Sequence, residues 1–233
     1  MSYKDPNRKI GSQSEIPTLT VNRDLLAING YQVFNIYLPD KRLEFIGKPN
    51  KFKHISHTLC KLNIEENCNT ICDIGCNSGL CSLIAHNNNF TEIVSLDHDS
   101  EYINILGSIK EHCGITNIHE RVFSFGDNIN KKFDIVFCGA LIHWIYSLTA
   151  DFRQFDKIIE YLLGFTNKYI LIEWVEPHDS AIKCLNHISK NALDTDEIYS
   201  TENFEKSINK YMKLISKQQI DGDTRWLYIL QIL

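Results

Sequence analysis

The stretch ICDIGCNSGL, Ile71 to Leu80, brings together an acid, two glycines and two cysteines. Such a set fits a metal site, a phosphate loop or a loop that places a carboxylate beside open backbone. No Gly-Lys-Ser/Thr follows Gly79, which excludes a Walker-type phosphate loop. Asn77 and Ser78 stand where a dinucleotide fingerprint needs a glycine, and Asp73 would repel a pyrophosphate. The stretch therefore predicts a loop for a cationic nucleoside, with glycines that let the ligand approach the backbone.

Further polar positions follow the next apolar runs. Asp97 ends EIVSLD, Asp127 lies in SFGDNI, and FDIVFCGALIHW begins at Phe133 and turns at Gly139. The carboxyl ends of parallel strands form the edge of a sheet where such folds bind ligands. Asp97 and Asp127 are thus candidate ligand groups, although either alone also fits a solvated loop. Asp134 is predicted to cap or brace its strand.

These motifs, in this order, resemble those of class I S-adenosylmethionine-dependent methyltransferases over about residues 60 to 233. The resemblance implies S-adenosylmethionine as the cofactor. It implies that Asp73 and the glycine turn hold its amino-acid end, that Asp97 accepts hydrogen bonds from both ribose hydroxyls, and that Asp127 reads the adenine amino group. The implied cofactor-binding residues are Asp73, Gly75, Cys76, Asn77, Gly79, Asp97, His98, Asp127, Asn128 and Gly139.

Methyl transfer to an oxygen requires an aligned acceptor and a base for its proton. Histidine side chains titrate near neutrality, so His143, in GALIHWIY after the fourth strand, is the first candidate for that base; a structural histidine that caps the following helix is the alternative. Glu173, in LIEWVEPHD, is predicted to orient His143 or to bind a substrate hydroxyl.

An acceptor wall is predicted nearby. Trp144, Tyr146 and Trp174 are the candidate side chains, although core packing would explain them equally well, and His178 is a further candidate substrate residue.

The acceptor class is predicted from motifs that are absent and present. CGAL stands where amino-methylating enzymes have Asp/Asn-Pro-Pro-Tyr/Phe, and the Glu-x-x-Glu-His-x-x-His metal cluster of small-RNA 2′-O-methyltransferases is missing. GALIHW, EWVEPHD, ENFEKSI and TRWLY resemble small-molecule methyltransferases found with sugar-modifying enzymes. That resemblance implies O-methylation of a sugar or a nucleotide-linked sugar. An RNA or protein methyltransferase and a non-catalytic methyltransferase-like subunit remain as alternatives.

Composition sets further expectations. The 233 residues carry a net charge of -5, which predicts no general attraction to nucleic acid or anionic membranes. The start of the chain lacks a signal-peptide core and YILIEWV is too short to span a bilayer, so a cytoplasmic protein is expected. The eight cysteines form no CxxC pair and are expected to be reduced core thiols; no metal is predicted, including at His178, Cys184 and His187.

These residues must be positioned by alternating strands and helices. Apolar runs predict strands at 70–75, 92–97, 119–125, 133–138 and 169–175, with helices at 79–87, 100–113, 152–164 and 179–191 between and after them. A helix at 51–63 precedes this set. A helix at 200–212 and a hairpin of strands 213–220 and 225–233 around DGDT follow it.

Alternation of this kind predicts an α/β fold: a doubly wound, seven-stranded, mostly parallel sheet with a terminal antiparallel strand, in three α/β/α layers. The chain is expected to divide into a mobile arm (1–20), a cover segment (21–50) and a methyltransferase domain (51–233).

Overall fold

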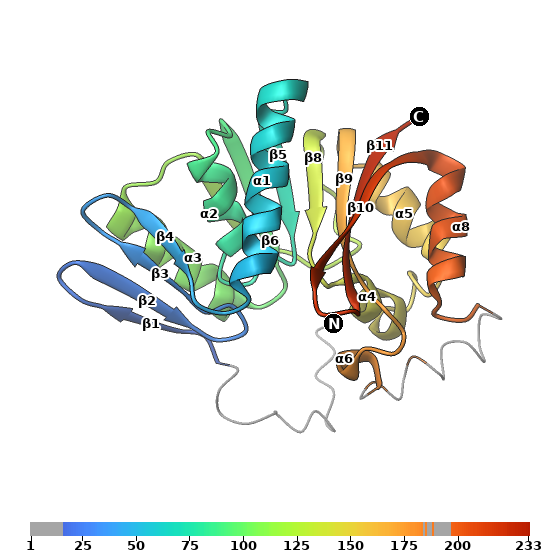
Figure 1. Ribbon diagram of the computed structural model, residues 1–233, viewed down its shortest axis with the longest axis horizontal. Coiled ribbons are helices and arrows are strands. Elements are labelled where there is room, and N and C mark those ends of the chain that lie inside the picture. The colour runs from blue at the N-terminus through green and yellow to red at the C-terminus, as the bar shows by residue number, and fades with distance from the viewer. Residues whose placement is uncertain (1–15, 184, 186–187, 189–196) are drawn as a thin grey trace.

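The computed structural model describes residues 16–183, 185, 188 and 197–233. Two sheets follow one another along the chain, a small antiparallel one and a large one flanked by helices (Figure 1). Within the described ranges, no helix is long and apolar enough to cross a membrane.

The small sheet occupies most of the predicted cover segment. Its strands are paired in sequence order, each antiparallel to the next: β1 (Thr18–Val21), β2 (Leu25–Asn29), β3 (Phe34–Tyr37) and β4 (Arg42–Phe45). Because β1 already begins at Thr18, the predicted arm 1–20 overlaps the sheet; residues 1–15 lie outside the described part.

The large sheet has the strand order β10-β11-β9-β8-β5-β6-β7. Its strands are β5 (Thr70–Ile74), β6 (Glu92–Asp97), β7 (Ile118–Val122), β8 (Phe133–Cys138), β9 (Thr166–Val175), β10 (Met212–Asp221) and β11 (Arg225–Ile232). β11 lies antiparallel between β9 and β10, whereas β5 to β9 pair in parallel. The predicted seven-stranded, mostly parallel sheet is confirmed.

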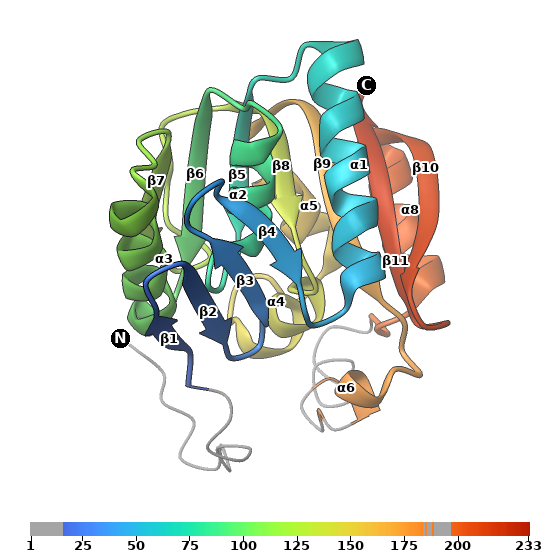
Figure 2. The same cartoon turned by 60° about the vertical axis from the view of Figure 1, so that its left-hand side comes forward.

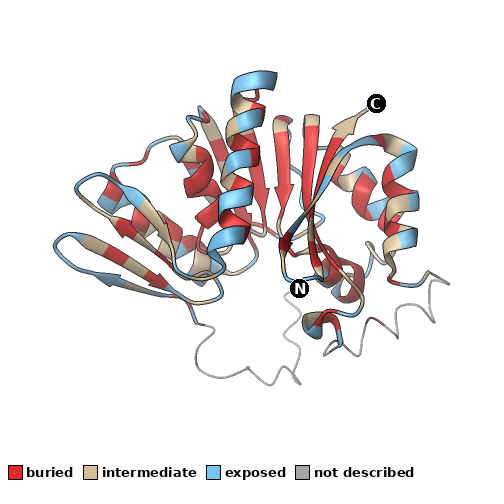
Figure 3. Ribbon diagram, viewed as in Figure 1, coloured by how far each residue is buried: buried red, intermediate tan, exposed pale blue. Residues whose placement is uncertain are grey.

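Helices cover both faces of this sheet. They are α1 (Pro49–Glu66), α2 (Leu80–Asn87), α3 (Ser100–Cys113), α4 (Ile142–Leu148), α5 (Phe155–Leu163), α6 (Ser180–Lys183) and α8 (Thr201–Tyr211). α1, α2 and α3 pack in one core cluster and α4, α5 and α8 in a second one, so the strands between them are buried (Figures 1 and 3).

The small sheet lies over the face that carries α2 and α3 (Figure 2). Its inward side chains Leu26, Ile28, Phe34 and Ile36 are almost fully buried and belong to the same cluster as Leu80 and Leu83 of α2. The cover segment is therefore packed on the main domain through a continuous apolar core.

Local chemistry explains where several elements begin and end. Asp99 caps α3 by accepting the Glu101 amide at 2.9 Å, and Gly114 ends that helix with a positive φ of 63°. Ser200 caps α8 by accepting the Asn203 amide at 3.2 Å. The predicted helix 179–191 begins as α6, and most of its remaining residues lie outside the described part.

Candidate cofactor and acceptor site

The glycine loop joins the central strand β5 to α2 at the carboxyl edge of the sheet. Gly75, Asn77 and Gly79 have φ values of 74°, 54° and 84°, a region that glycine enters freely and asparagine tolerates. The amides of Gly75 and Cys76 donate to the Leu96 carbonyl at 2.7 and 2.9 Å. The loop is thus fixed to the end of β6.

Asp97 connects this loop to β6. Its carboxylate accepts the Asn77 amide at 2.8 Å and the Asp99 amide at 3.0 Å, and His98 Nδ1 lies 3.2 Å from it. Asp97 is buried, whereas the His98 side chain is largely exposed. The structure brings the predicted residues Asp73 to Gly79, Asp97 and His98 together.

Asp73 is almost completely buried below the loop. It accepts a 2.6 Å hydrogen bond from the Ser82 hydroxyl, which lies 2.7 Å from the Ser95 hydroxyl. Burial raises the pKa of Asp73 to about 7, and the Ser82 hydrogen bond opposes that shift. No ion pair involving this carboxylate occurs among the described residues. A buried carboxylate without a cation beside an open loop suits a ligand that carries positive charge.

Asp127 and Asn128 are exposed after β7. Asp127 accepts the Ser124 amide at 2.9 Å, and the Tyr161 hydroxyl donates to the Asp127 carbonyl and accepts the Gly126 amide at 2.9 Å. Tyr161, which the sequence reasoning missed, thus fixes this turn.

The β8–α4 connection reaches the glycine loop. A Cβ built on Gly75 would meet Leu141 Cδ2 at 2.9 Å, and one on Gly139 would lie 3.7 Å from Glu173 Oε2. The cofactor loop and the predicted acceptor side are therefore adjacent. His143 follows in the first turn of α4 and is buried at 3% exposure.

Glu173 is held by two cations. Lys51 Nζ lies 2.6 Å from its Oε2 and Arg225 Nη1 lies 3.4 Å from its Oε1. Arg225 also donates through Nε to Asp179 Oδ2 at 2.9 Å. Two cations, one from α1 and one from β11, thus pair with the two oxygens of Glu173.

These four charges form a buried network at the carboxyl edge. Burial opposes the charge of Asp179, but hydrogen bonds from Arg225 and Thr224 hold the pKa of Asp179 far below its usual value. The sequence does not predict that Lys51, Asp179 and Arg225 form an ion-pair network with Glu173. The sequence does indicate that Lys51 is buried, because Lys51 shares helical spacing with the buried residues Ile55, Leu59 and Leu62.

Two of the three candidate wall residues, Tyr146 and Trp174, are core side chains, which is the alternative that the sequence left open. Trp174 is fully buried and stacks between Tyr199 and Phe204, with ring centroids at 4.7 and 4.3 Å. Tyr146 is fully buried as well and stacks on Phe155. Both are core side chains because packing satisfies the rings and hydrogen bonds satisfy their polar ends.

The remaining predicted acceptor residues reach the surface. Trp144 is 41% exposed on α4, and His178 is exposed ahead of α6.

A cavity of about 410 Å³ that is largely open to solvent lies between the start of α1 and the β10–β11 turn. Polar side chains dominate its wall, among them Lys48, Asn50, Lys51, His54 and Gln219. Lys51 therefore connects the cavity to Glu173 and, through it, to Gly139.

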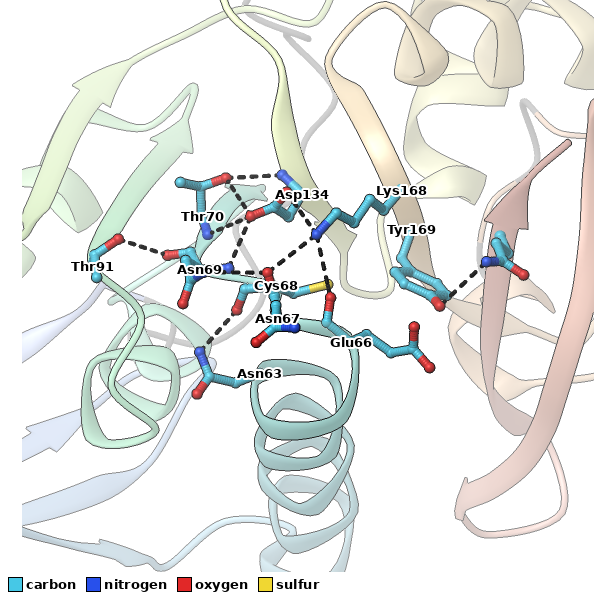
Figure 4. Close-up of polar contacts among 11 residues, drawn as sticks. Asn63, Glu66, Asn67, Cys68, Asn69, Thr70, Thr91, Asp134, Lys168 and Tyr169 are labelled. Atoms are coloured by element: carbon cyan, nitrogen blue, oxygen red, sulfur yellow. Dashed lines mark hydrogen bonds and ion pairs between the residues drawn. The ribbon is translucent and has the colours of Figure 1, made fainter.

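A second polar cluster lies at the opposite, amino edge of the sheet (Figure 4). Asp134 accepts the amides of Asn69 and Thr70 at 2.8 and 3.1 Å and pairs with Lys168 at 3.4 Å. Partial burial opposes its charge, but these contacts lower the pKa of Asp134. Its contacts brace β5 against β8, in keeping with the structural role predicted for it.

Over the described ranges, no group of three or more His, Cys, Asp or Glu side chains could hold a metal ion. Cys184 and His187 lie outside those ranges.

The fold and the acid-glycine loop define a class of protein. Class I methyltransferases share this strand order, in which the antiparallel strand β11 lies between β9 and β10. They also share the loop that follows the central strand β5. The family model of ribosomal protein L11 methyltransferase (PrmA) matches residues 55–160. No curated protein matches the chain.

Solved structures have the same fold. Magnesium protoporphyrin IX methyltransferase (ChlM) from Synechocystis PCC 6803 aligns with a TM-score of 0.56 at 12% identity, over 78% of each chain. N-methyltransferase NodS from Bradyrhizobium japonicum WM9 gives 0.59 at 11% identity, over 80% of this chain and 99% of its own. WbdD gives 0.58 at 17% identity, over 77% of this chain and 39% of its own.

The resemblance to class I S-adenosylmethionine-dependent methyltransferases is thus confirmed, as is the predicted fold class. S-adenosylmethionine is the cofactor of this class.

Proposed function

We propose that this chain methylates a hydroxyl group of a sugar or a nucleotide-linked sugar, with His143 as the general base. The observation that carries the methyltransferase part is the pair of buried acids, Asp73 and Asp97, on either side of the glycine loop. Neither a phosphate loop nor a metal site calls for that combination.

The residues at the loop fit the cofactor. Asp73 offers a buried carboxylate to a cationic amino-acid end, and Asp97 offers acceptor oxygens beside the loop for ribose hydroxyls. Asp127 and Asn128 follow the neighbouring strand as candidates for the adenine end. When bound, S-adenosylmethionine supplies a methyl group activated by its sulfonium.

The acceptor is proposed to enter from the cavity at the start of α1. Its volume of about 410 Å³ is in the range of small-molecule sites, and its polar lining suits a ligand with several hydroxyls. Lys51 and Glu173 lie between this cavity and Gly139. His143 accepts the proton of the acceptor hydroxyl as that oxygen becomes methylated.

The experiment is an acceptor screen. The purified protein is incubated with methyl-labelled S-adenosylmethionine and, in separate arms, with UDP-glucose, GDP-mannose and dTDP-rhamnose, with total RNA, and with ribosomal protein L11. Label in a nucleotide sugar supports the proposal. Label in RNA or protein alone would overturn the sugar acceptor, and no label in any arm would favour a non-catalytic subunit.

Protein methylation is a second candidate, which one observation favours. The matching family model is that of ribosomal protein L11 methyltransferase, and it spans the loop and Asp97. The L11 arm of the screen tests it directly.

His143 has a prediction of its own. His143→Ala is expected to lower turnover at least a hundredfold, because general-base catalysis is lost, while the affinity for S-adenosylhomocysteine stays within twofold. Turnover is measured with the acceptor found in the screen, and affinity by calorimetry. His112→Ala, on exposed α3 surface, is the control. Normal turnover of His143→Ala would remove His143 from the mechanism.

A cytoplasmic location is part of the proposal. The seven cysteines within the described ranges are free thiols, which suits a reducing compartment.

A further inference from the structure

The small N-terminal sheet makes a direct polar contact with the glycine loop. Gln32, in the β2–β3 turn, accepts the Leu80 amide through Oε1 at 3.0 Å and donates through Nε2 to the Cys76 carbonyl at 3.3 Å. One carboxamide therefore bridges the two ends of the Cys76–Leu80 segment.

This contact replaces a missing helix cap. Leu80 is the first residue of α2, and the residue at the N-cap position is Gly79, which has no side chain to accept the first amides. The other amides of the loop donate elsewhere: Asn77 to Asp97, Ser78 to the Asn77 side chain, and Gly79 to the Cys76 carbonyl. Gln32 supplies from another segment the acceptor that Ser, Thr or Asp would otherwise supply locally.

The position of Gln32 is itself well fixed. Ile28 and Phe34, the last pair of the β2–β3 ladder, are 1% and 0% exposed. The carbonyl of Val33 accepts the amides of Ile46 and Gly47 at 3.2 and 2.9 Å. The β2–β3 turn is thus fixed by the buried pair at its base and by hydrogen bonds to the residues after β4. The Gln32 carboxamide therefore meets the glycine loop at a defined position.

We infer that the N-terminal sheet helps to shape the cofactor site, because its Gln32 holds the glycine loop in place and is thus a positioning residue. The inference rests on the proposed function, in which this loop holds the amino-acid end of the cofactor. Without Gln32 the loop and the first turn of α2 spend time in other conformations. The apparent affinity for the cofactor then falls in proportion to the competent fraction.

The test compares two amide-to-apolar substitutions in the same sheet. Gln32→Met removes the bridge, and Asn35→Leu removes a half-buried carboxamide that bonds Glu44 at 3.0 Å and does not contact the loop. Binding of S-adenosylhomocysteine is measured by calorimetry, exchange of the Leu80 amide by NMR, and the midpoint of thermal unfolding by calorimetry.

Gln32→Met is expected to weaken binding of S-adenosylhomocysteine roughly tenfold, because the loss of a helix cap destabilises a helix start by a free energy of that order. It is also expected to speed exchange of the Leu80 amide. Asn35→Leu is expected to change neither, even if it lowers the unfolding midpoint as much. Equal binding by Gln32→Met and the unchanged protein, or equal losses in both variants, would overturn the inference.

Two further outcomes are separable. If the unchanged protein binds neither S-adenosylmethionine nor S-adenosylhomocysteine, the proposed function fails and the inference fails with it; binding by the unchanged protein isolates the effect of Gln32. If Gln32→Met does not fold, Gln32→Glu, which keeps an acceptor oxygen for the Leu80 amide, is expected to lose less than tenfold.

Discussion

At the scale of single residues, the most unusual group in the site is the Asp73 carboxyl. It is 1% exposed and accepts a hydrogen bond from the Ser82 hydroxyl, which in turn bonds the Ser95 hydroxyl; no ion pair with a described cation neutralises it. Desolvation therefore dominates and raises its pKa from 3.8 to about 7. Ionisation of the Asp73 carboxyl thus opposes folding.

Asp73→Asn tests this directly. Because the folded-state pKa lies above the unfolded value, the contribution of Asp73 to stability is complete below about pH 4 and is lost as the pH rises to about 7. The free energy of unfolding of the unchanged protein should fall relative to Asp73→Asn over that window, by up to about 4 kcal/mol. Urea unfolding at pH 4 to 8 without cofactor measures it.

Asp134→Asn is the control, because the contribution of Asp134 to the free energy of unfolding changes with pH in the opposite direction. The pKa of Asp134 is lowered, so its contribution is present near neutral pH and is lost as the pH falls through the folded-state value. Parallel pH curves for Asp73→Asn and the unchanged protein would show that Asp73 is not desolvated.

The positions of Asp73 and Asp97 in the strand order could be predicted from sequence, but the ion-pair partners of Glu173 could not. Asp73 and Asp97 follow strands in a fixed order, and that order is visible in one dimension. The partners of Glu173 come from α1 and β11, far away in the chain, and only the packing of those elements decides that Lys51 and Arg225 meet it. The burial of Trp174 could not be decided from sequence, because an aromatic residue at a strand end fits core and surface equally.

At the scale of elements, the β5–α2 turn depends on Gly79 for two reasons. Its φ is 84°, and a Cβ there would lie 2.5 Å from Leu106 Cδ1 of α3. The turn therefore needs both a left-handed backbone and the close approach of a neighbouring helix.

Gly79→Ala is expected to lower the free energy of unfolding by at least about 1 kcal/mol more than Gly222→Ala does. Gly222, in the β10–β11 turn, also has a positive φ of 55°, but its Cβ would meet no atom within 4 Å, so it reports the backbone term alone. Chemical unfolding of both variants gives the difference. Equal losses would show that Leu106 moves aside freely.

The helices and strands differ in how clearly the sequence predicts them. Long apolar runs and periodic helices of the main domain were predicted close to their observed bounds, because burial on both faces leaves a strong signal. The four strands of the cover segment were not predicted, since each has four or five residues between turn residues. α4 was missed for the same reason, being seven residues long.

At the scale of the whole molecule, the network of Lys51, Glu173, Arg225 and Asp179 joins α1, β9, β11 and the start of α6. Apolar residues of similar size would often stabilise such a position at least as well. Its place between the cavity and Gly139 agrees with a role in holding the acceptor side in shape.

Lys51→Met tests whether this buried network contributes more to the free energy of unfolding than an exposed ion pair does. Removing Lys51 leaves Glu173, at 1% exposure, with Arg225 as its remaining described ion-pair partner, and the free energy of unfolding should fall by about 3 kcal/mol. Lys48→Met, three residues earlier, breaks an ion pair with Asp221 whose side chains are 47% and 32% exposed, and should lower it by less than about 1 kcal/mol. Urea unfolding at neutral pH measures both. Similar losses would mean that water reaches Glu173 and that the four elements are joined by apolar packing alone.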